Sequence, residues 1–122
     1  MPYAVSQASI LTSTKKALNI PEEVTVFDTD IIMHINSAFS KLNQLGVGTS
    51  QGFSIEDSSS TWDEFIDDSR LNMVQSYVYL EVRLLFDPPT ASLLTSMEKK
   101  RDELEWRLAV VAEDIREEVQ FA

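Results

Sequence analysis

The carboxylates between Glu56 and Asp68 are the residues of this chain best placed to do chemistry. Six acids fall in this stretch and no lysine or arginine interrupts them: Glu56, Asp57, Asp63, Glu64, Asp67 and Asp68. Clustered carboxylates suit a hard cation such as Ca²⁺, but the central glycine and terminal glutamate of an EF-hand loop are missing. Asp63 and Asp67 lie four residues apart and can face a common substrate, although general acid–base work would require burial to separate their pKa values. We therefore favour a solvated acidic segment whose members cap helices.

Other catalytic groups are scarce. The chain has no cysteine, which excludes disulfides, thiolate zinc sites, iron–sulfur clusters and cysteine nucleophiles. His34 is the only histidine, and no serine or carboxylate is placed to complete a triad with it. The segment Gly46-Val47-Gly48 lacks the lysine and the following helix of a phosphate-binding loop. We predict that the protein is not an enzyme and that it has no catalytic residue, no cofactor and no bound metal.

The overall charge argues against a protein that grips nucleic acid. The 122 residues include 20 acids and 10 lysines or arginines, so the formal net charge is −10. Tight binding to nucleic acid depends on a basic surface that neutralises phosphates, whereas an acidic surface favours solubility and repels DNA. The first residues do not resemble a signal peptide, and no apolar run approaches the roughly 20 residues of a membrane helix. We expect no membrane partner and a protein made in the cytoplasm.

The spacing of apolar residues predicts an all-α fold, a small bundle of four to five helices. With 3 Gly and 4 Pro, the chain has too few turn residues for an all-β fold. The expected helices cover residues 6–19, 28–45, a short segment after Ser60 or Thr61, 68–86 and 90–118. Their expected N-caps are Ser6 or Ser9, Asp28 or Thr29, and Asp68 or Ser69. The helices make one domain over residues 1–118, with a long loop at 46–60, in which 53–55 alternate like a very short strand, and a tail at 119–122.

The helix over residues 68–86 is expected to be the central one, because it is apolar on two sides. Glu81 and Arg83 are the charges inside it, and each either points out through a gap or pairs with a neighbour. In the last helix, Arg101 interrupts the apolar stripe.

Apolar residues away from the expected core are candidates for contact with a partner. Trp106 lies off the main stripe of the last helix, so we expect it to be exposed, and tryptophan is enriched at binding hot spots. Trp62, close to Phe65 in the sequence, is expected to fill the core under the loop. The long loop and the end of the chain supply the other candidates, which are Val47, Phe53, Ile55, Ile115, Val119 and Phe121.

The most distinctive block of the sequence runs from Tyr77 to Thr90 and ends its helix at Phe86-Asp87-Pro88-Pro89. Shorter blocks stand in order around it, at residues 10–16, 27–32, 34–36, 42–48, 52–55, 60–62 and 103–108. This series resembles the small head–tail connector (adaptor) proteins of siphophages and of prophages of Gram-positive bacteria. The resemblance spans residues 10–110, and its blocks are structural rather than catalytic.

The resemblance implies a helical subunit that forms a ring, commonly of twelve copies, beneath the portal protein at the vertex through which DNA leaves the capsid. Such a ring extends the DNA channel, joins the capsid to the stopper and tail proteins, and lets DNA pass without specific binding. The protein would then lie in the virion at the head–tail interface, after synthesis in the cytoplasm of the bacterial host. We expect the acids of 56–68, or those of the last helix, to face the channel, and the chain end to dock on the portal.

Two interpretations from other classes stay open. An acidic inhibitor or DNA mimic would also carry a charge of −10, and it would bind a basic enzyme without forming a ring. An enzyme that uses the clustered carboxylates with a metal would bind divalent ions and lose its function when Asp63 or Asp67 is changed. The mass of the protein in solution, with and without a portal protein, separates the connector from both.

Overall fold

The computed structural model describes residues 6–48 and 51–121, with Phe121 as backbone only. This part of the chain holds four α-helices and two 3-10 turns and no strand, which confirms the all-α prediction. The α-helices are α1 (Ile10–Ala17), α2 (Asp28–Gln44), α3 (Met73–Phe86) and α4 (Ala91–Phe121), and the 3-10 turns are η1 (Trp62–Glu64) and η2 (Ser69–Leu71).

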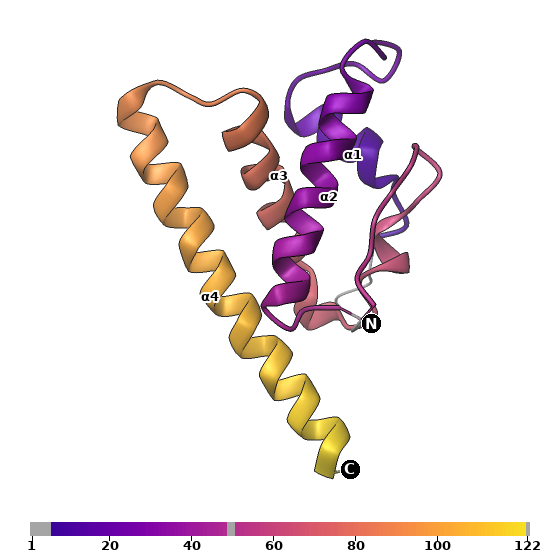
Figure 1. Ribbon diagram of the computed structural model, residues 1–122, viewed down its shortest axis with the longest axis vertical. Helices are drawn as coiled ribbons and strands as arrows, with labels where there is room; N and C mark the ends of the chain where they lie inside the picture. The colour runs from indigo at the N-terminus through magenta and orange to yellow at the C-terminus, as the bar shows by residue number, and fades with distance from the viewer. Residues whose placement is uncertain (1–5, 49–50, 122) are drawn as a thin grey trace.

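Helix α3 is central, as its two apolar sides predict. It packs against α1, α2 and α4, while α4 also contacts η2. Figure 1 shows α4 along one edge of the bundle, with its C-terminal part running past the other helices. With 31 residues, α4 is about 46 Å long at 1.5 Å per residue. One side of this helix therefore faces the bundle and the other is left free.

Helix α1 is shorter than the expected 6–19. Ser9 is its N-cap, and the Ser9 hydroxyl accepts a hydrogen bond from the Thr12 backbone N–H at 3.2 Å. The helix ends before Asn19, which has a φ of +63°, a left-handed conformation that asparagine tolerates better than most residues. The proline two residues later prevents any continuation.

The start of α2 differs from the expectation that Asp28 or Thr29 caps it. Phe27 is the N-cap residue, and its side chain makes no capping hydrogen bond. Asp28 instead pairs with the buried Lys15 of α1 at 2.8 Å. The same ammonium group donates to the Glu22 carbonyl at 2.9 Å. A buried lysine needs such partners, so this contact fastens α1 and the 22–28 turn to the start of α2.

A Schellman motif ends α2 and begins the long loop. The Gly46 N–H donates to the Asn43 carbonyl at 3.0 Å, and the Val47 N–H donates to the Leu42 carbonyl at 2.9 Å. Gly46 has a φ of +86°, which glycine adopts without steric cost. The motif turns Val47 back onto Leu42, and both side chains are buried.

The long loop is held by a side chain of α2 rather than by a strand. The Asn36 amide donates to the Ile55 carbonyl at 3.0 Å, and its carbonyl oxygen accepts from the Ile55 N–H at 2.8 Å. The expected strand character at 53–55 is thus wrong, because one asparagine satisfies the backbone that a neighbouring strand would have paired. The remaining bridge between extended residues joins Ser9 to Thr61.

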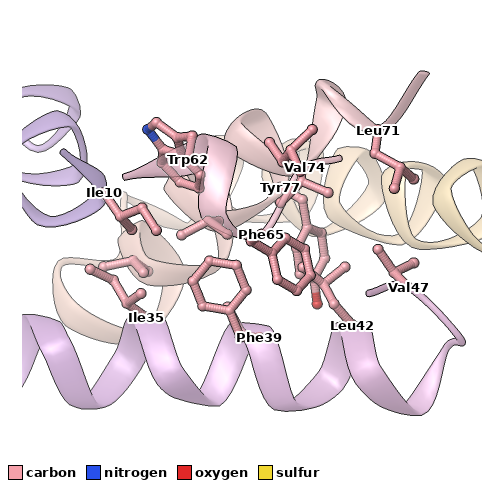
Figure 2. Close-up of a cluster of buried hydrophobic side chains, with 14 of the residues drawn as sticks. Ile10, Ile35, Phe39, Leu42, Val47, Trp62, Phe65, Leu71, Val74 and Tyr77 are labelled. Atoms are coloured by element: carbon pink, nitrogen blue, oxygen red, sulfur yellow. The ribbon is translucent and has the colours of Figure 1, made fainter. Parts of the chain in front are cut away.

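Aromatic side chains from α2, the loop and η1 fill the core under the loop (Figure 2). The Phe39 ring lies 4.7 Å from that of Phe65 and 5.0 Å from that of Phe53, centroid to centroid. Trp62 is fully buried, as predicted, and meets the edge of Tyr79 at 5.8 Å. Such tilted and edge-on pairs each add about 0.5–1.5 kcal/mol beyond burial of their area.

The expected tail at 119–122 is wrong in its first three residues. Helix α4 continues through Phe121, because residues 113–121 include no glycine or proline and are compatible with a solvated helix. Residue 122 lies outside the described part of the chain.

We predict that Gly48→Ala destabilises the protein by about 2–4 kcal/mol in urea unfolding. Gly48 has a φ of +90°, and a Cβ added there would lie 2.7 Å from a ring carbon of the buried Phe65. Gly52→Ala is the matched control, because its φ of +81° is similar but no atom lies within 4 Å of the added Cβ. The control should lose only about 1–2 kcal/mol. Equal losses in the two variants would contradict the role given to the Phe65 contact.

Candidate functional site

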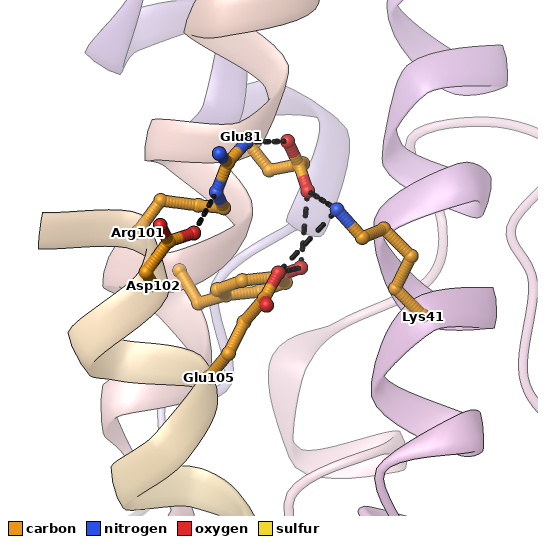
Figure 3. Close-up of polar contacts among 6 residues, drawn as sticks. Lys41, Glu81, Arg101, Asp102 and Glu105 are labelled. Carbon is orange, nitrogen blue, oxygen red and sulfur yellow. Dashed lines mark hydrogen bonds and ion pairs between the residues drawn. The ribbon is translucent and has the colours of Figure 1, made fainter. Parts of the chain in front are cut away.

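A buried carboxylate joins the three long helices. Glu81 of α3 is 2% exposed, and its oxygens lie 2.6 Å from the Lys41 ammonium of α2 and 3.3 Å from the Arg101 guanidinium of α4. The Tyr77 hydroxyl lies 3.0 Å from Glu81 and 2.8 Å from Glu105. Figure 3 shows the side chains of Lys41, Glu81, Arg101 and Glu105 converging between α2 and α4. We call this set of five residues the ion cluster.

Charges and hydrogen bonds within the ion cluster outweigh the cost of burial. Burial alone would raise the pKa of Glu81, but the hydrogen bond and charge of Lys41, together with Tyr77 and Arg101, hold it below the ordinary 4.5. Burial would likewise lower the pKa of Lys41, and Glu81 raises it above the ordinary 10.5. Burial, followed by the hydrogen bond to Glu105, raises the pKa of Tyr77. Glu81 is therefore ionised and Tyr77 is a neutral donor at neutral pH.

The ion cluster accounts for Glu81 and Arg101, the charges that interrupt the apolar residues of α3 and α4. Arg101 replaces an apolar residue of α4 because it faces Glu81, and it also pairs with Asp102 at 2.8 Å. Arg83, the other charge of α3, donates to the Asp87 carbonyl at 2.6 Å and so pairs locally. The arrangement positions α4 against α2 and α3.

The acidic segment acts locally as a set of caps. The Asp57 carboxylate accepts from the Ser59 N–H at 2.8 Å, and Asp68 accepts from the Arg70 N–H at 2.9 Å. Glu64 accepts from the Thr61 N–H at 2.6 Å and closes a capping box. The hydrogen bonds from Ser59 lower the pKa of Asp57, and those from Arg70 lower that of Asp68.

The remaining acids of the segment do not point toward a common site. The Asp63 carboxylate bonds the Thr61 hydroxyl, whereas Glu56 and Asp67 are exposed and make no side-chain hydrogen bond or ion pair with the described residues. Within residues 6–48 and 51–121, no three His, Asp or Glu side chains are grouped to hold a metal ion. His34 is half-buried, with its ring 6.3 Å from that of Phe86.

The free side of α4 carries exposed apolar residues. Trp106 is 68% exposed, as predicted, and Val110, one turn later, is 39% exposed. Val119 is 75% exposed in the part of α4 that passes the bundle. The Phe121 side chain lies outside the described part of the chain. We call Trp106 and Val110, together with the exposed acids Asp102 and Glu113, the outer face of α4.

Four other partner candidates contact the protein's own core instead. Val47 and Ile55 are buried, held by the Schellman motif and by Asn36. Phe53 is half-buried against Phe39, and Ile115 is half-buried against the core. The side chains of Val47 and Ile55 have almost no exposed area in the folded protein. We therefore withdraw these two residues as partner contacts.

A second exposed apolar group was missed by sequence reasoning. Val26, Phe27, Met33 and Leu85 are between 42% and 77% exposed, at the end of the bundle where α2 begins and α3 stops. The Phe27 ring meets that of Phe86 edge-on at 5.6 Å. The available signal was the pair Val26-Phe27 directly before a helix, outside its apolar stripe.

The sequence matches one known protein family over most of its length. The model of the family described as phage connector protein matches residues 10–114, which include all of α1, α2 and α3, the ion cluster and Trp106. The chain belongs to the phage connector protein family. The searches of curated proteins and of solved structures gave no match.

The connector is thus a structural protein of a bacteriophage, as its sequence blocks suggested. Val119 and Phe121 lie beyond the matched residues, whereas the acidic segment lies within them. Among the helices described here, none is both long and apolar enough to cross a membrane.

We predict that Glu81→Gln destabilises the connector by about 2–3 kcal/mol, measured by urea unfolding at pH 7. Breaking a buried pair costs about 3–5 kcal/mol, and the value is lower here because Lys41 is 46% exposed and keeps part of its hydration. Glu103→Gln is the control, since its pairs with Lys100 and Arg107 are half-exposed and lie within one helix. The control should change stability by less than about 0.5 kcal/mol.

The same variant tests the titration of Glu81. Because its folded pKa is lowered, Glu81 contributes stability above the unfolded value of 4.5 and loses it as the pH falls through the folded pKa. The difference in unfolding free energy between the native protein and Glu81→Gln should be constant from about pH 6 to 9 and shrink below about pH 4.5. A difference that grows on acidification would show that Glu81 is protonated in the folded state.

Proposed function

We propose that this connector subunit is a head–tail adaptor that forms a ring beneath the portal of a tailed phage, extends the DNA channel, and joins the capsid to the stopper or tail. The observation that carries the proposal is the match of the phage connector family over residues 10–114. The order of sequence blocks adds the long-tailed phages and prophages of Gram-positive bacteria as the source. On this proposal the protein is a virion component made in the host cytoplasm, and it has no catalytic activity.

Two exposed apolar surfaces on different parts of the subunit support a ring. Closed rings are built from head-to-tail contacts between two different surfaces of each copy. The exposed residues Trp106 and Val110 on α4, and the group around Phe27 at the end of the bundle, supply apolar surfaces on different parts of the subunit. Exposed apolar groups of this kind on a small domain are typical of binding surfaces.

The acidic segment suits the wall of a DNA channel. Glu56, Asp57, Asp63, Glu64 and Asp67 are exposed, and Asp68 is half-exposed. A negative wall repels phosphates, so DNA slides past without being held. The caps formed by Asp57, Glu64 and Asp68 keep this segment in one conformation while its remaining charge faces solvent.

The end of α4 suits a contact with the portal. Beyond Ile115 no residue of the helix joins the hydrophobic core. The Glu118 carboxylate pairs with the Arg70 guanidinium of η2, with 2.8 Å between the two side chains. Val119 is exposed on this end, beyond the residues common to the family. We propose that residues 116–122 dock on the portal.

An acidic inhibitor that mimics DNA is the second candidate, and the net charge of −10 is the observation in its favour. Such a protein binds a basic enzyme as a monomer. The mass measurement below separates it from the adaptor.

We predict a ring-sized species by light scattering after size exclusion when the connector is mixed with the portal protein of the same phage. A chain that ends at Ile115 should keep its fold but lose binding to the portal, because the core residues of α4 do not extend beyond this point. A full-length monomer that ignores the portal would overturn the adaptor proposal, and tight binding of that monomer to a basic nuclease would favour the inhibitor. Portal binding by the shortened chain would reject only the docking role of residues 116–122.

We further predict that Glu56→Lys with Asp67→Lys slows DNA ejection from assembled particles, because the added cations would bind passing phosphates. These two acids are chosen because both are exposed and neither side chain makes a hydrogen bond or ion pair with the described residues. Glu22→Lys with Glu23→Lys is the control, with the same change in net charge at another exposed site. Unchanged packaging and ejection in the first variant would exclude the segment from the channel wall.

A further inference from the structure

An apolar groove runs across α3 between α1 and α4. Ala17 forms its α1 side, Tyr79 and Leu80 its floor, and Met97 part of its α4 side. Tyr79, Leu80 and Met97 are half-buried, so the subunit covers them only in part. The groove is thus a partly uncovered apolar stretch of α3 between α1 and α4.

The rim of the groove is basic in a strongly acidic protein. Arg83 and Lys100 line it, and no aspartate or glutamate does. Both cations also make exposed pairs within their own region, Arg83 with Asp87 at 3.8 Å and Lys100 with Glu103 at 3.7 Å, and such exposed pairs are weak. The chain as a whole has twice as many acids as bases. A partner for this groove should therefore offer an apolar side chain flanked by carboxylates.

The outer face of α4 has this chemistry. Trp106 and Val110 each lie two residues from the fully buried Leu108, so they point about 160–200° away from the core. Glu113 follows Val110 by three residues and Asp102 precedes Trp106 by four, which places these acids beside the apolar pair. Both acids are exposed, and Asp102 also pairs with Arg101 of its own helix at 2.8 Å.

We propose that the outer face of α4 in one copy, led by Trp106, packs into the α1–α3–α4 groove of the next copy. The inference rests on the proposed ring and identifies its subunit contact. Trp106 fills the apolar groove between Leu80 and Met97, while Asp102 and Glu113 approach Arg83 and Lys100. Because the two surfaces lie on different sides of the subunit, the contact is heterologous and can repeat around a ring.

Cysteine cross-linking tests this contact directly, since the native chain has no cysteine. Val110→Cys marks the outer face and leaves Trp106 intact, and Ser76→Cys marks the groove, of which Ser76 is an exposed lining residue. A chain with both changes is treated with a short bismaleimide, alone and with the portal protein. The expected product is a ladder of covalent oligomers on a denaturing gel.

The controls make the result specific. Each single-cysteine variant should run as a monomer on the denaturing gel. Val110→Cys combined with Ser58→Cys, an exposed loop position outside the groove, should do the same. Dimers from Val110→Cys alone would indicate a symmetric contact and overturn the proposal, as would a double variant without a ladder. If the native chain still forms a ring with the portal in that case, the adaptor function stands and only this contact is wrong.

The anchor itself gives a second measurement. Trp106→Ser should raise the protein concentration needed for half-assembly by at least about tenfold, whereas Trp106→Phe should retain most assembly. Trp106 is 68% exposed in the subunit, so neither change should lower its thermal stability. Normal assembly of Trp106→Ser would overturn the proposal.

Discussion

Glu81 is a carboxylate with almost no access to water, and the arrangement of the three long helices depends on how its charge is compensated. An isolated buried carboxylate is strongly unfavourable, so a stable fold has to bring cations to it. Lys41 comes from α2 and Arg101 from α4, while Tyr77, one turn before Glu81, connects it to Glu105. Apolar burial alone would tolerate small shifts of α4 along α3. The ion cluster selects one register, because only one brings Arg101 to Glu81.

That register decides which side of α4 is free. Leu104, Leu108 and Ala112 face the core, so Trp106 and Val110 are left pointing outward. The proposed subunit contact uses this outward side and the basic groove on α3, two surfaces that a single copy cannot bring together. In the proposed ring, the packing that stabilises the subunit therefore also presents the surface used for assembly.

The acidic segment combines local capping with exposed negative charge. Several of its carboxylates cap turns within the segment and hold backbone N–H groups, which gives the long loop a defined end at η1 and η2. A carboxylate that caps a turn remains charged, because hydrogen bonds from N–H groups favour the ionised form. The segment is therefore ordered and negative at once, as the wall of a channel for DNA requires.

Local patterns in the sequence were sufficient for much of the fold. Helical periodicity gave four α-helices, the two-sided apolar pattern of α3 gave its central place, and Gly46 and Asp87-Pro88-Pro89 gave the stops of α2 and α3. The exposure of Trp106 followed from its place off the stripe of α4. These features depend on residues within a few turns of one another, and therefore on short-range sterics and hydrogen bonding.

Other features depend on residues far apart in the chain, and only the tertiary structure decided them. Lys41, Glu81 and Arg101 are distant in sequence, and their pairing required the helices to be packed. Val47 and Ile55 looked available in a loop, yet the turn after α2 and the amide of Asn36 buried them. The groove on α3 was also hidden, because periodicity reports that a helix has two apolar sides without saying which neighbour leaves one of them uncovered.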